Sequence, residues 1–384
     1  MVLTKPVEET QPAFSFYIFK PELYISRFFI CYNKFVNNKT KSMSKIRVAI
    51  NGLGRIGRAF FKLAQERDEI EIVAINDLGD IENLAYLLKY DTAYGPSKFK
   101  VEIKKGEIVV NNNAIDILSE KDPALLPWDK MNVDVVVEST GVFNTYEAAR
   151  KHIDAGAKRV VISAPAKSEP KDETEATVLM GINDDKLQTC EVSSNASCTT
   201  NAGSPLMAIL DEKIGIEKAL LNTVHGYTAT QSLVDAPSKK DFRRGRAAAM
   251  NIIPASTGAA IATTEALPQL KDKFDGIALR VPVIVGSIAD ITFIAKRDTT
   301  VEEVNKILED AAKDSRWEGI FTATKDPIVS RDITGNTHAA IADLSFTRVV
   351  GGNLVKVLSW YDNEMGYSNA LLEHVIKTGK LAQK

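Results

Sequence analysis

The sequence predicts an α/β fold in which a doubly wound, mostly parallel sheet is followed by an α+β part with a mixed or antiparallel sheet. Up to about residue 163, short β-branched apolar runs alternate with helical patterns, as in parallel sheets that helices cover. A glycine-rich turn joins the first run to the first helical pattern. After about Ser197 the apolar runs are longer, and few helical patterns separate them.

The first half contains the alternating elements. The pattern predicts, in order, a strand at 46–50, a helix at 58–67, and strands at 70–75, 133–137 and 159–163, with a helix at 147–155 before the last strand. Gly156 follows that helix and is a suitable residue to end it. Because strand–helix–strand units set consecutive strands parallel, these elements predict one sheet with helices on both faces.

The second half contains longer strand-like runs. Strands are predicted at 219–225, 277–285, 288–296 and 354–360, with a helix at 300–315. A final helix at 368–378 is expected to pack back on the first half. This pattern is typical of a mixed or antiparallel sheet with helices beside it.

The composition indicates a soluble globular protein. Of 384 residues, 45% are hydrophobic and 26% charged, and the net charge is −2. This balance does not favour nucleic acid or a membrane as the main partner. The three cysteines form neither a disulfide framework nor a metal-binding pattern, so we expect a cytoplasmic protein without a structural metal.

Residues 1–42 differ from the remainder. They are rich in Phe, Tyr, Ile, Asn and Lys, and their apolar runs are too short for a secretory signal. We expect a disordered extension, or a start assigned upstream of Met43.

A dinucleotide site is predicted at the first turn. Gly52, Gly54 and Gly57 have the G-x-G-x-x-G spacing between a strand and a helix, where backbone N–H groups can bind a pyrophosphate. Asp77 follows the second strand, about 20 residues after the turn, where a carboxylate binds ribose hydroxyls. Because this carboxylate would repel a 2′-phosphate and no basic residue follows it closely, NAD is favoured over NADP in a Rossmann-type domain. A turn or capping role is the alternative for Asp77.

Cys198 is the candidate nucleophile. Small polar residues precede it and a helical stretch follows, so it is expected at a helix N-terminus, where the thiol pKa is lowered. His225 ends an apolar strand and is the candidate base, because a thiol nucleophile is activated by a neighbouring histidine. A structural histidine is the alternative, and the sequence alone does not establish the contact.

Four motifs resemble the phosphorylating glyceraldehyde-3-phosphate dehydrogenase family, in the family's order and approximate spacing from about Met43 to the C-terminus. They are Asn51–Arg58, Ser194–Asn201, Val224–Thr228 and Trp360–Glu364. The resemblance implies an NAD-binding domain at 43–197, completed by residues 363–384, and a catalytic domain at 198–362. It also implies a homotetramer in the glycolytic pathway, with glyceraldehyde 3-phosphate and inorganic phosphate as substrates.

The resemblance also implies roles by position. Cys198 would form a thioester, and His225 would be its partner and general acid/base. Cofactor contacts would come from Gly52, Gly54, Arg55, Ile56, Gly57, Asp77, Ser163 and Asn363. Phosphate groups would be bound by Ser197, Thr199, Thr228, Thr257, Gly258 and Arg280.

Other functions stay open at this stage. An erythrose-4-phosphate dehydrogenase or an NADP-linked form would share the fold, and the former would release the acyl group to water. More remote is an aspartate-semialdehyde or acyl-phosphate reductase. A non-enzymatic alternative is a thiol-based redox sensor or an RNA-associated protein, which the near-zero net charge argues against as the main role.

Overall fold

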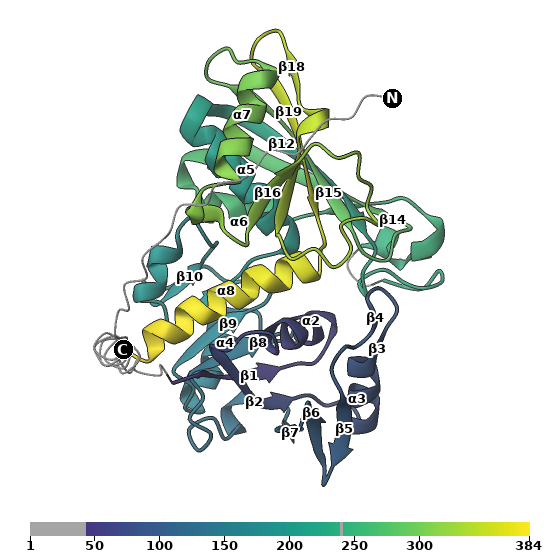
Figure 1. Cartoon of the computed structure of the whole chain (residues 1–384), viewed down its shortest axis with the longest axis vertical. Coiled ribbons are helices and arrows are strands. Elements are labelled where there is room, and N and C mark those ends of the chain that lie inside the picture. Colours follow the sequence, from purple (N-terminus) through teal and green to yellow (C-terminus); the bar gives the residue numbers. More distant parts are fainter. Residues whose placement is uncertain (1–43, 239–240) are drawn as a thin grey trace, which may run out of the picture. The chain divides into compact units, whose positions relative to one another are not determined.

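A computed structural model describes residues 44–238 and 241–384 (Figure 1). The prediction for residues 1–42 lies outside the described residues. Residues Lys45–Lys384 group into one unit, which holds two large sheets and the helices packed on them.

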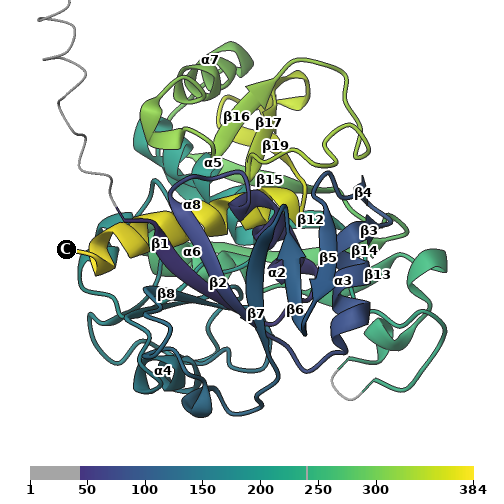
Figure 2. The same ribbon diagram turned by 60° about the horizontal axis from the view of Figure 1, so that its bottom comes forward.

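The first sheet has nine strands and forms the predicted doubly wound half. In spatial order they are β10 (Glu175–Thr177), β11 (Val192–Ser194), β9 (Arg159–Ile162), β8 (Val135–Glu138), β1 (Ile46–Asn51), β2 (Ile70–Asn76), β7 (Asn113–Leu118), β6 (Glu107–Val110) and β5 (Val101–Lys104). The run from β10 to β7 is parallel, and β6 and β5 are antiparallel (Figure 2). The order in which strands are added to the sheet reverses at β1, because β2 lies on one side of β1 and β8 lies on the other.

The antiparallel strands β5 to β7 were not predicted. Their tight turns use residues with positive φ, Lys105 and Gly106 in one turn and Asn111 and Asn112 in the other. Such left-handed pairs match the twist of two-residue hairpins. The signal was therefore present in the turn chemistry, and a reading based on apolar periodicity missed it.

Helices cover both faces of this sheet. Val48 and Ile50 of β1 pack in one cluster with α2 (Arg55–Ala64) and α8 (Met365–Ala382). Ala49 points to the other face and packs with α4 (Tyr146–Asp154). This alternation follows from the two-residue period of a strand, and it confirms the doubly wound arrangement. The first helix begins at Arg55, three residues before the predicted start.

The second sheet is mixed, as predicted. Its order is β13 (Ile253–Ser256), β14 (Phe274–Val281), β12 (Ile216–Gly226), β15 (Ser287–Ala295), β19 (Leu354–Tyr361), β17 (Ala340–Asp343) and β16 (Phe321–Thr324), with β18 (Arg348–Val350) paired to β19. Helices α5 (Cys198–Ile214), α6 (Ala259–Ala266) and α7 (Val301–Ala311) contribute to its core cluster. Two predicted ranges were too long, because β14 ends at Val281 and α7 ends at Ala311.

The shorter elements connect these layers. They are α3 (Ile81–Lys89), the ribbon β3 (Tyr90–Asp91) and β4 (Gly95–Pro96), and the 3-10 turns η1 (Pro123–Leu125), η2 (Asp184–Gln188), η3 (Phe242–Gly245), η4 (Ala248–Met250), η5 (Pro268–Leu270), η6 (Ser315–Trp317) and η7 (Leu344–Phe346).

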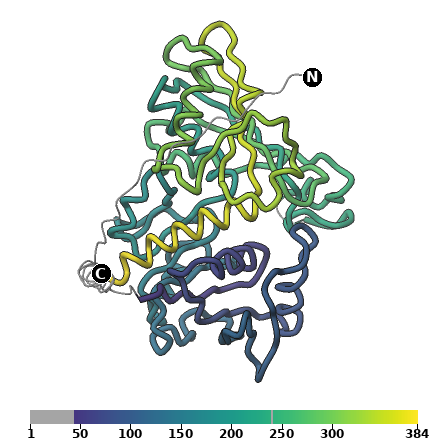
Figure 3. Tube along the Cα trace, viewed as in Figure 1, coloured from purple at the N-terminus to yellow at the C-terminus, as the bar shows by residue number. Residues whose placement is uncertain are grey.

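The last helix returns to the first strand. In Figure 3 the C-terminal segment runs back to the beginning of the described chain. A Cβ at Gly379 would lie 2.2 Å from Cγ2 of Ile46, so the helix approaches β1 more closely than a side chain would allow. The expected packing of the C-terminal helix on the first half is confirmed.

Candidate active site

The glycine-rich turn has a different geometric requirement at each glycine. A Cβ at Gly57 would lie 2.1 Å from the carbonyl oxygen of Gly52, so only glycine permits this helix–strand approach. Gly52 has φ +97°, and its Cβ would lie 2.7 Å from the backbone nitrogen of Thr140. Among the described residues, no atom lies within 4 Å of a Cβ at Gly54. The structure thus leaves room at the middle glycine, as the approach of a pyrophosphate requires.

Asp77 lies beside this turn. Its Oδ2 accepts a hydrogen bond from the backbone N–H of Leu53 (2.6 Å), and its Oδ1 accepts one from Gly79 (2.8 Å). Asp77, Gly52 and Gly54 line a cavity of about 340 Å³ at the carboxyl ends of β1, β2 and β8. Ligands of doubly wound sheets bind where the strand order reverses, and this cavity lies there.

Other residues line the same cavity, and sequence reasoning did not assign them. They are Asn51, Asn76, Leu78, Glu120, Lys121, Ser139, Thr140, Val142 and Phe143. Ser139 and Thr140 directly follow β8, so their position at the end of an apolar run could have identified them from the sequence as candidates for the cofactor site. Arg55 forms ion pairs with Asp91 and Glu364, which leaves its backbone N–H and that of Ile56 as the candidate phosphate donors.

Cys198 is the first residue of α5, as expected. Ser197 is the N-cap, and its Oγ accepts a hydrogen bond from the backbone N–H of Thr200 (3.1 Å). Ala196 precedes it in a left-handed conformation, with φ +53°. Tyr367 on α8 holds this turn by donating to the Ala196 carbonyl oxygen (3.0 Å). Neighbouring elements therefore determine where the Cys198 side chain points.

The structure brings Cys198 and His225 together. The Cys198 Sγ lies 3.3 Å from Nε2 of His225, although 27 residues separate them. On the other side of the ring, Nδ1 lies 2.6 Å from the Gly226 carbonyl oxygen and 2.7 Å from Nη1 of Arg280. Strands β12 and β14 are parallel, with His225 opposite Arg280, so strand register sets this contact. The family resemblance implied the pairing of Cys198 with His225, but the contact between His225 and Arg280 was not predicted.

The electrostatics of the pair differ from the expectation. Burial raises the pKa of the Cys198 thiol, and the Arg280 guanidinium lowers it by a smaller amount. Burial, followed by the charge of Arg280, lowers the pKa of His225 to about 3. Backbone hydrogen bonds at the start of α5 lower the thiol pKa, as predicted, but burial outweighs them because the sulfur packs against the hydrophobic clusters of both sheets. The predicted net lowering of the Cys198 pKa is therefore not found.

Tyr361 also contacts the pair, although no role had been assigned to it. Its ring packs edge-on against His225, with centroids 5.8 Å apart. Its hydroxyl contacts Thr199 Oγ1 (2.9 Å) and Thr223 Oγ1 (2.7 Å). Thr199 is buried, and this contact engages its hydroxyl within the protein.

The remaining candidates for phosphate binding lie on strand β14, on loops and at helix starts. Arg280 Nε is buried and has no hydrogen-bond partner among the described residues. Thr228 Oγ1 contacts Thr230 Oγ1 (2.9 Å). Gly258 is the N-cap of α6, and Thr257 Oγ1 accepts from the backbone N–H of Ala259 (3.2 Å). These positions offer hydroxyls, a helix N-terminus and a guanidinium, which are the usual donors to phosphate oxygens.

Hydrogen bonds through Ser287 connect Asn363 to β12, the strand that carries His225. The Asn363 Oδ1 accepts from the backbone N–H of Gly286 (3.1 Å) and from the hydroxyl of Ser287 (3.1 Å). The same Ser287 hydroxyl accepts from the backbone N–H of Gly226 (3.2 Å). Because its oxygen is held in this way, the amide orientation of Asn363 is defined. Ser163 follows β9, and its N–H donates to the carbonyl oxygen of Glu138 (2.9 Å).

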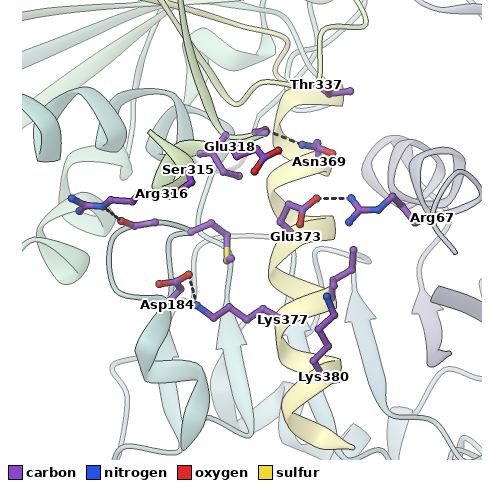
Figure 4. A pocket seen from close by; sticks show the side chains of 15 residues that line it. Arg67, Asp184, Ser315, Arg316, Glu318, Thr337, Asn369, Glu373, Lys377 and Lys380 are labelled. Carbon is purple, nitrogen blue, oxygen red and sulfur yellow. Dashed lines mark hydrogen bonds and ion pairs between the residues drawn. The ribbon is translucent and has the colours of Figure 1, made fainter. Parts of the chain in front are cut away.

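A second cavity, of about 720 Å³, lies along α8, between this helix and the segments around Gly181 and Glu318 (Figure 4). In this view Lys377 points to Asp184 and Glu373 points to Arg67, and both pairs form ion pairs. These contacts tie α8 to η2 and to the chain after α2. Cys198 and His225 are not among the residues that line this cavity.

A bilayer-spanning helix needs a long apolar run, and none of the helices described between residues 44 and 384 has one. Over the same described ranges, no group of three or more His, Cys, Asp or Glu side chains is arranged to hold a metal ion.

The fold and the site define an oxidoreductase that uses a nicotinamide dinucleotide and has a cysteine beside a histidine. Residues 46–146 match the family model described as glyceraldehyde 3-phosphate dehydrogenase, NAD binding domain, and residues 197–363 match the model for its C-terminal domain. The chain belongs to the glyceraldehyde-3-phosphate dehydrogenase family, and NAD is its cofactor.

Curated relatives carry the same name. The protein from Streptomyces coelicolor is 50% identical over 337 residues, which are 87% of this chain and 98% of the relative. The protein from Borreliella burgdorferi is 48% identical over 335 residues, 85% of this chain and 98% of the relative. The protein from Salmonella typhimurium is 46% identical over 335 residues, 87% of this chain and 99% of the relative.

Proposed function

We propose that Cys198 and His225 carry out the reaction of this family, in which D-glyceraldehyde 3-phosphate, NAD and inorganic phosphate give 1,3-bisphosphoglycerate and NADH. The observation that carries this proposal is the 3.3 Å contact between Sγ and Nε2 at the start of α5. A thiol beside an imidazole is the arrangement that activates a cysteine nucleophile.

The chemistry of the pair follows from the tautomer of His225. When Nδ1 donates its proton to the Gly226 carbonyl oxygen, Nε2 is free to accept the thiol proton. The sulfur then attacks the aldehyde carbon, and Nε2 returns the proton to the carbonyl oxygen to give a thiohemiacetal. The Cys198 backbone N–H lies at the helix start and can stabilise negative charge on that oxygen.

Oxidation uses the same nitrogen again. Nε2 removes the hydroxyl proton of the thiohemiacetal as hydride leaves its carbon. Bound NAD supplies the hydride acceptor. The resulting Cys198 thioester is attacked by inorganic phosphate, and the thiolate leaves as the acyl phosphate forms. Covalent catalysis thus divides the reaction into an oxidation and an acyl transfer.

Arg280 is the best supported residue for the substrate's own phosphate. It is close to His225, and its Nε has no partner within the described part of the chain. Thr228 begins the next segment after β12 and is the second candidate. For inorganic phosphate we propose Ser197, Thr257 and Gly258. Thr199 is the weakest candidate, because Tyr361 engages its hydroxyl.

The cofactor groups are assigned to the residues whose geometry fits them. The open space at Gly54, with the N–H groups of Arg55 and Ile56, would take the pyrophosphate. Asp77 would bind the adenosine ribose, and Gly52 and Gly57 would shape the turn. Asn363 and Ser163 are proposed near the nicotinamide half, and the defined amide orientation of Asn363 supports a role in fixing the ring.

We also propose that the protein is a cytoplasmic homotetramer with two domains per chain. The proposed boundaries are residues 43–197 with 363–384, and residues 198–362. Exposed apolar side chains on the outer face of the second sheet, such as Leu220 on β12 and Ile277 on β14, support self-association. The near-zero net charge argues against nucleic acid or a membrane as the main partner.

The test is NADH formation from glyceraldehyde 3-phosphate and NAD, with and without inorganic phosphate. We expect strong phosphate dependence and no turnover from Cys198→Ser. Turnover that ignores phosphate would indicate release of the acyl group to water, as in an erythrose-4-phosphate dehydrogenase. Absence of turnover with both NAD and NADP would contradict the proposal.

A further inference from the structure

A buried carboxylate lies beneath the proposed adenosine site. Glu138 is the last residue of β8 and is 2% exposed. Its Oε2 accepts from Asn51 Nδ2 (2.6 Å), and its Oε1 accepts from the backbone N–H of Thr140 (2.9 Å) and from the Thr140 hydroxyl. Burying a carboxylate is costly unless donors surround it, and here Asn51 and Thr140 supply donors to its two oxygens.

His152 supplies a further donor, and its tautomer is defined. The residue lies on α4 and is fully buried. The Trp128 indole N–H donates to His152 Nδ1 (3.0 Å), and an indole nitrogen can only donate. The imidazole proton is therefore on Nε2, which lies 3.2 Å from Glu138 Oε2 and donates to it. Trp128 therefore orients the His152 ring, and His152 donates a hydrogen bond to Oε2 of Glu138.

The network reaches the cavity through side chains at two strand ends. Asn51 ends β1, and its Oδ1 accepts from Asn76 Nδ2 at the end of β2 (2.7 Å). Asn76 also exchanges two hydrogen bonds with the backbone of Glu120 (2.8 and 2.9 Å). Asn51, Asn76, Glu120 and Thr140 all line the 340 Å³ cavity beside Asp77. Glu138 and His152 themselves are not among its lining residues.

We propose that Glu138, oriented by His152, is a positioning residue for the adenosine half of NAD. The carboxylate holds the Thr140 backbone on one side and the Asn51 amide on the other, so it sets the shape of the cavity before the cofactor binds. At metal sites, removing the groups that orient the ligating side chains typically weakens binding about tenfold or more, and we apply the same reasoning to side chains that orient this cavity. This inference rests on the proposed cofactor site.

The experiment measures equilibrium binding of NAD, ADP-ribose and AMP by calorimetry, together with the steady-state rate. Glu138→Gln replaces one acceptor oxygen with an amide N–H₂ group, which would face donors that it cannot accept from. His152→Leu removes the Nε2 donor to Glu138. We expect both to weaken AMP and NAD binding about tenfold, while the rate at saturating NAD changes less than about twofold. His152→Gln retains a donor near the Nε2 position and should restore most of the affinity.

Two controls separate this role from ordinary stability. Tyr146→Phe changes a buried side chain on the same helix, whose hydroxyl contacts Thr177 (3.3 Å) and not the network. It should lower the melting temperature without changing AMP affinity. Thr140→Val removes the hydroxyl contact to Glu138 and the hydrogen bond from the backbone N–H of Val142, while the Thr140 backbone N–H still donates to Glu138. It provides a mild variant if the others fold poorly, and it should also weaken AMP binding.

The outcomes distinguish a failure of the positioning role from a failure of the proposed cofactor site. If the Glu138, His152 and Thr140 variants lose stability but bind AMP as the native protein does, the positioning role is overturned. Asp77→Ala serves as the reference for the site itself. If it binds AMP and NAD normally, the proposed cofactor site is wrong. If it weakens binding and Glu138→Gln does not, only the present inference fails.

Discussion

The guanidinium of Arg280 lies 2.7 Å from Nδ1 of His225, on the ring edge opposite the Cys198 thiol. Nδ1 cannot donate to the Gly226 carbonyl oxygen and accept from Arg280 at the same time. The position of Arg280 therefore influences the tautomer of His225, the proposed base. A phosphate group that binds Arg280 would draw the guanidinium away and favour the tautomer with Nε2 free. If Arg280 binds the substrate's phosphate as proposed, substrate binding and base activation are linked through this one side chain.

The first prediction concerns thiol reactivity. The charge of Arg280 lowers the pKa of the Cys198 thiol, so Arg280→Met should raise it. We expect the pH midpoint of Cys198 alkylation by iodoacetamide to move upward by about one unit or more. Cys198→Ser provides the blank that corrects for labelling elsewhere. A midpoint that stays the same would mean that Arg280 does not act on the thiol.

The second prediction concerns substrate recognition. If Arg280 binds the substrate's phosphate, Arg280→Met should raise KM for glyceraldehyde 3-phosphate by about tenfold or more, since charge-assisted hydrogen bonds contribute over 1 kcal/mol each. Unphosphorylated glyceraldehyde lacks that group, so its kcat/KM should fall much less. Equal losses for both substrates would place the role of Arg280 in the chemistry of His225 alone.

The third prediction separates two glycines of the same turn. In Gly57→Ala the new methyl group meets the Gly52 carbonyl at 2.1 Å, so we expect a loss of about 1–3 kcal/mol in stability. In Gly54→Ala the methyl group enters open space, so the melting temperature should stay near that of the native protein while NAD affinity falls. Thermal unfolding and NAD titration measure the two effects. Normal NAD affinity in Gly54→Ala would argue against a pyrophosphate there.

The fourth prediction concerns acid stability. His374 on α8 is buried between Ser193 Oγ (2.8 Å) and Asn195 Oδ1 (3.1 Å), and burial lowers its pKa to about 3. From its ordinary pKa near 6.5 down to that value, the unfolded chain binds a proton that the folded protein does not. The free energy of unfolding should therefore fall as pH drops through this window.

His374→Leu removes this contribution. The slope of unfolding free energy against pH between about 4 and 6 should decrease by about 1.4 kcal/mol per pH unit. Urea unfolding at several pH values measures the slope, and values at pH 8 correct for the altered packing. An unchanged slope would show that another group dominates acid unfolding.

The fifth prediction concerns assembly. Leu220 is 67% exposed and Ile277 is 55% exposed on the second sheet, and burying such side chains favours association. Leu220→Lys combined with Ile277→Asp should shift sedimentation toward smaller species at equal concentration. Circular dichroism checks that the fold is kept. A native sedimentation profile would mean that subunits associate through another surface.

Local patterns were sufficient for much of the fold. Apolar periodicity located β1, β2, β8 and β9 of the parallel sheet and missed the three-residue strands β10 and β11. The spacing of Gly52, Gly54 and Gly57 identified the first turn, because it depends on neighbouring residues in the chain. Periodicity was less informative for the β5 to β7 hairpins. Their strands are short, and the deciding information lies in turn residues such as Asn111 and Asn112.

Local sequence patterns were enough to predict the fold class, the dinucleotide motif and the location of Cys198 at the start of a helix. The contact between Cys198 and His225 depends on how the chain folds, and the register of β12 and β14 sets Arg280 beside the imidazole. The pKa of the thiol also depended on tertiary structure, because burial between two hydrophobic clusters outweighs the local effect of a helix start. Long-range packing determines both contact and dielectric environment, and neither is encoded in a short stretch of sequence.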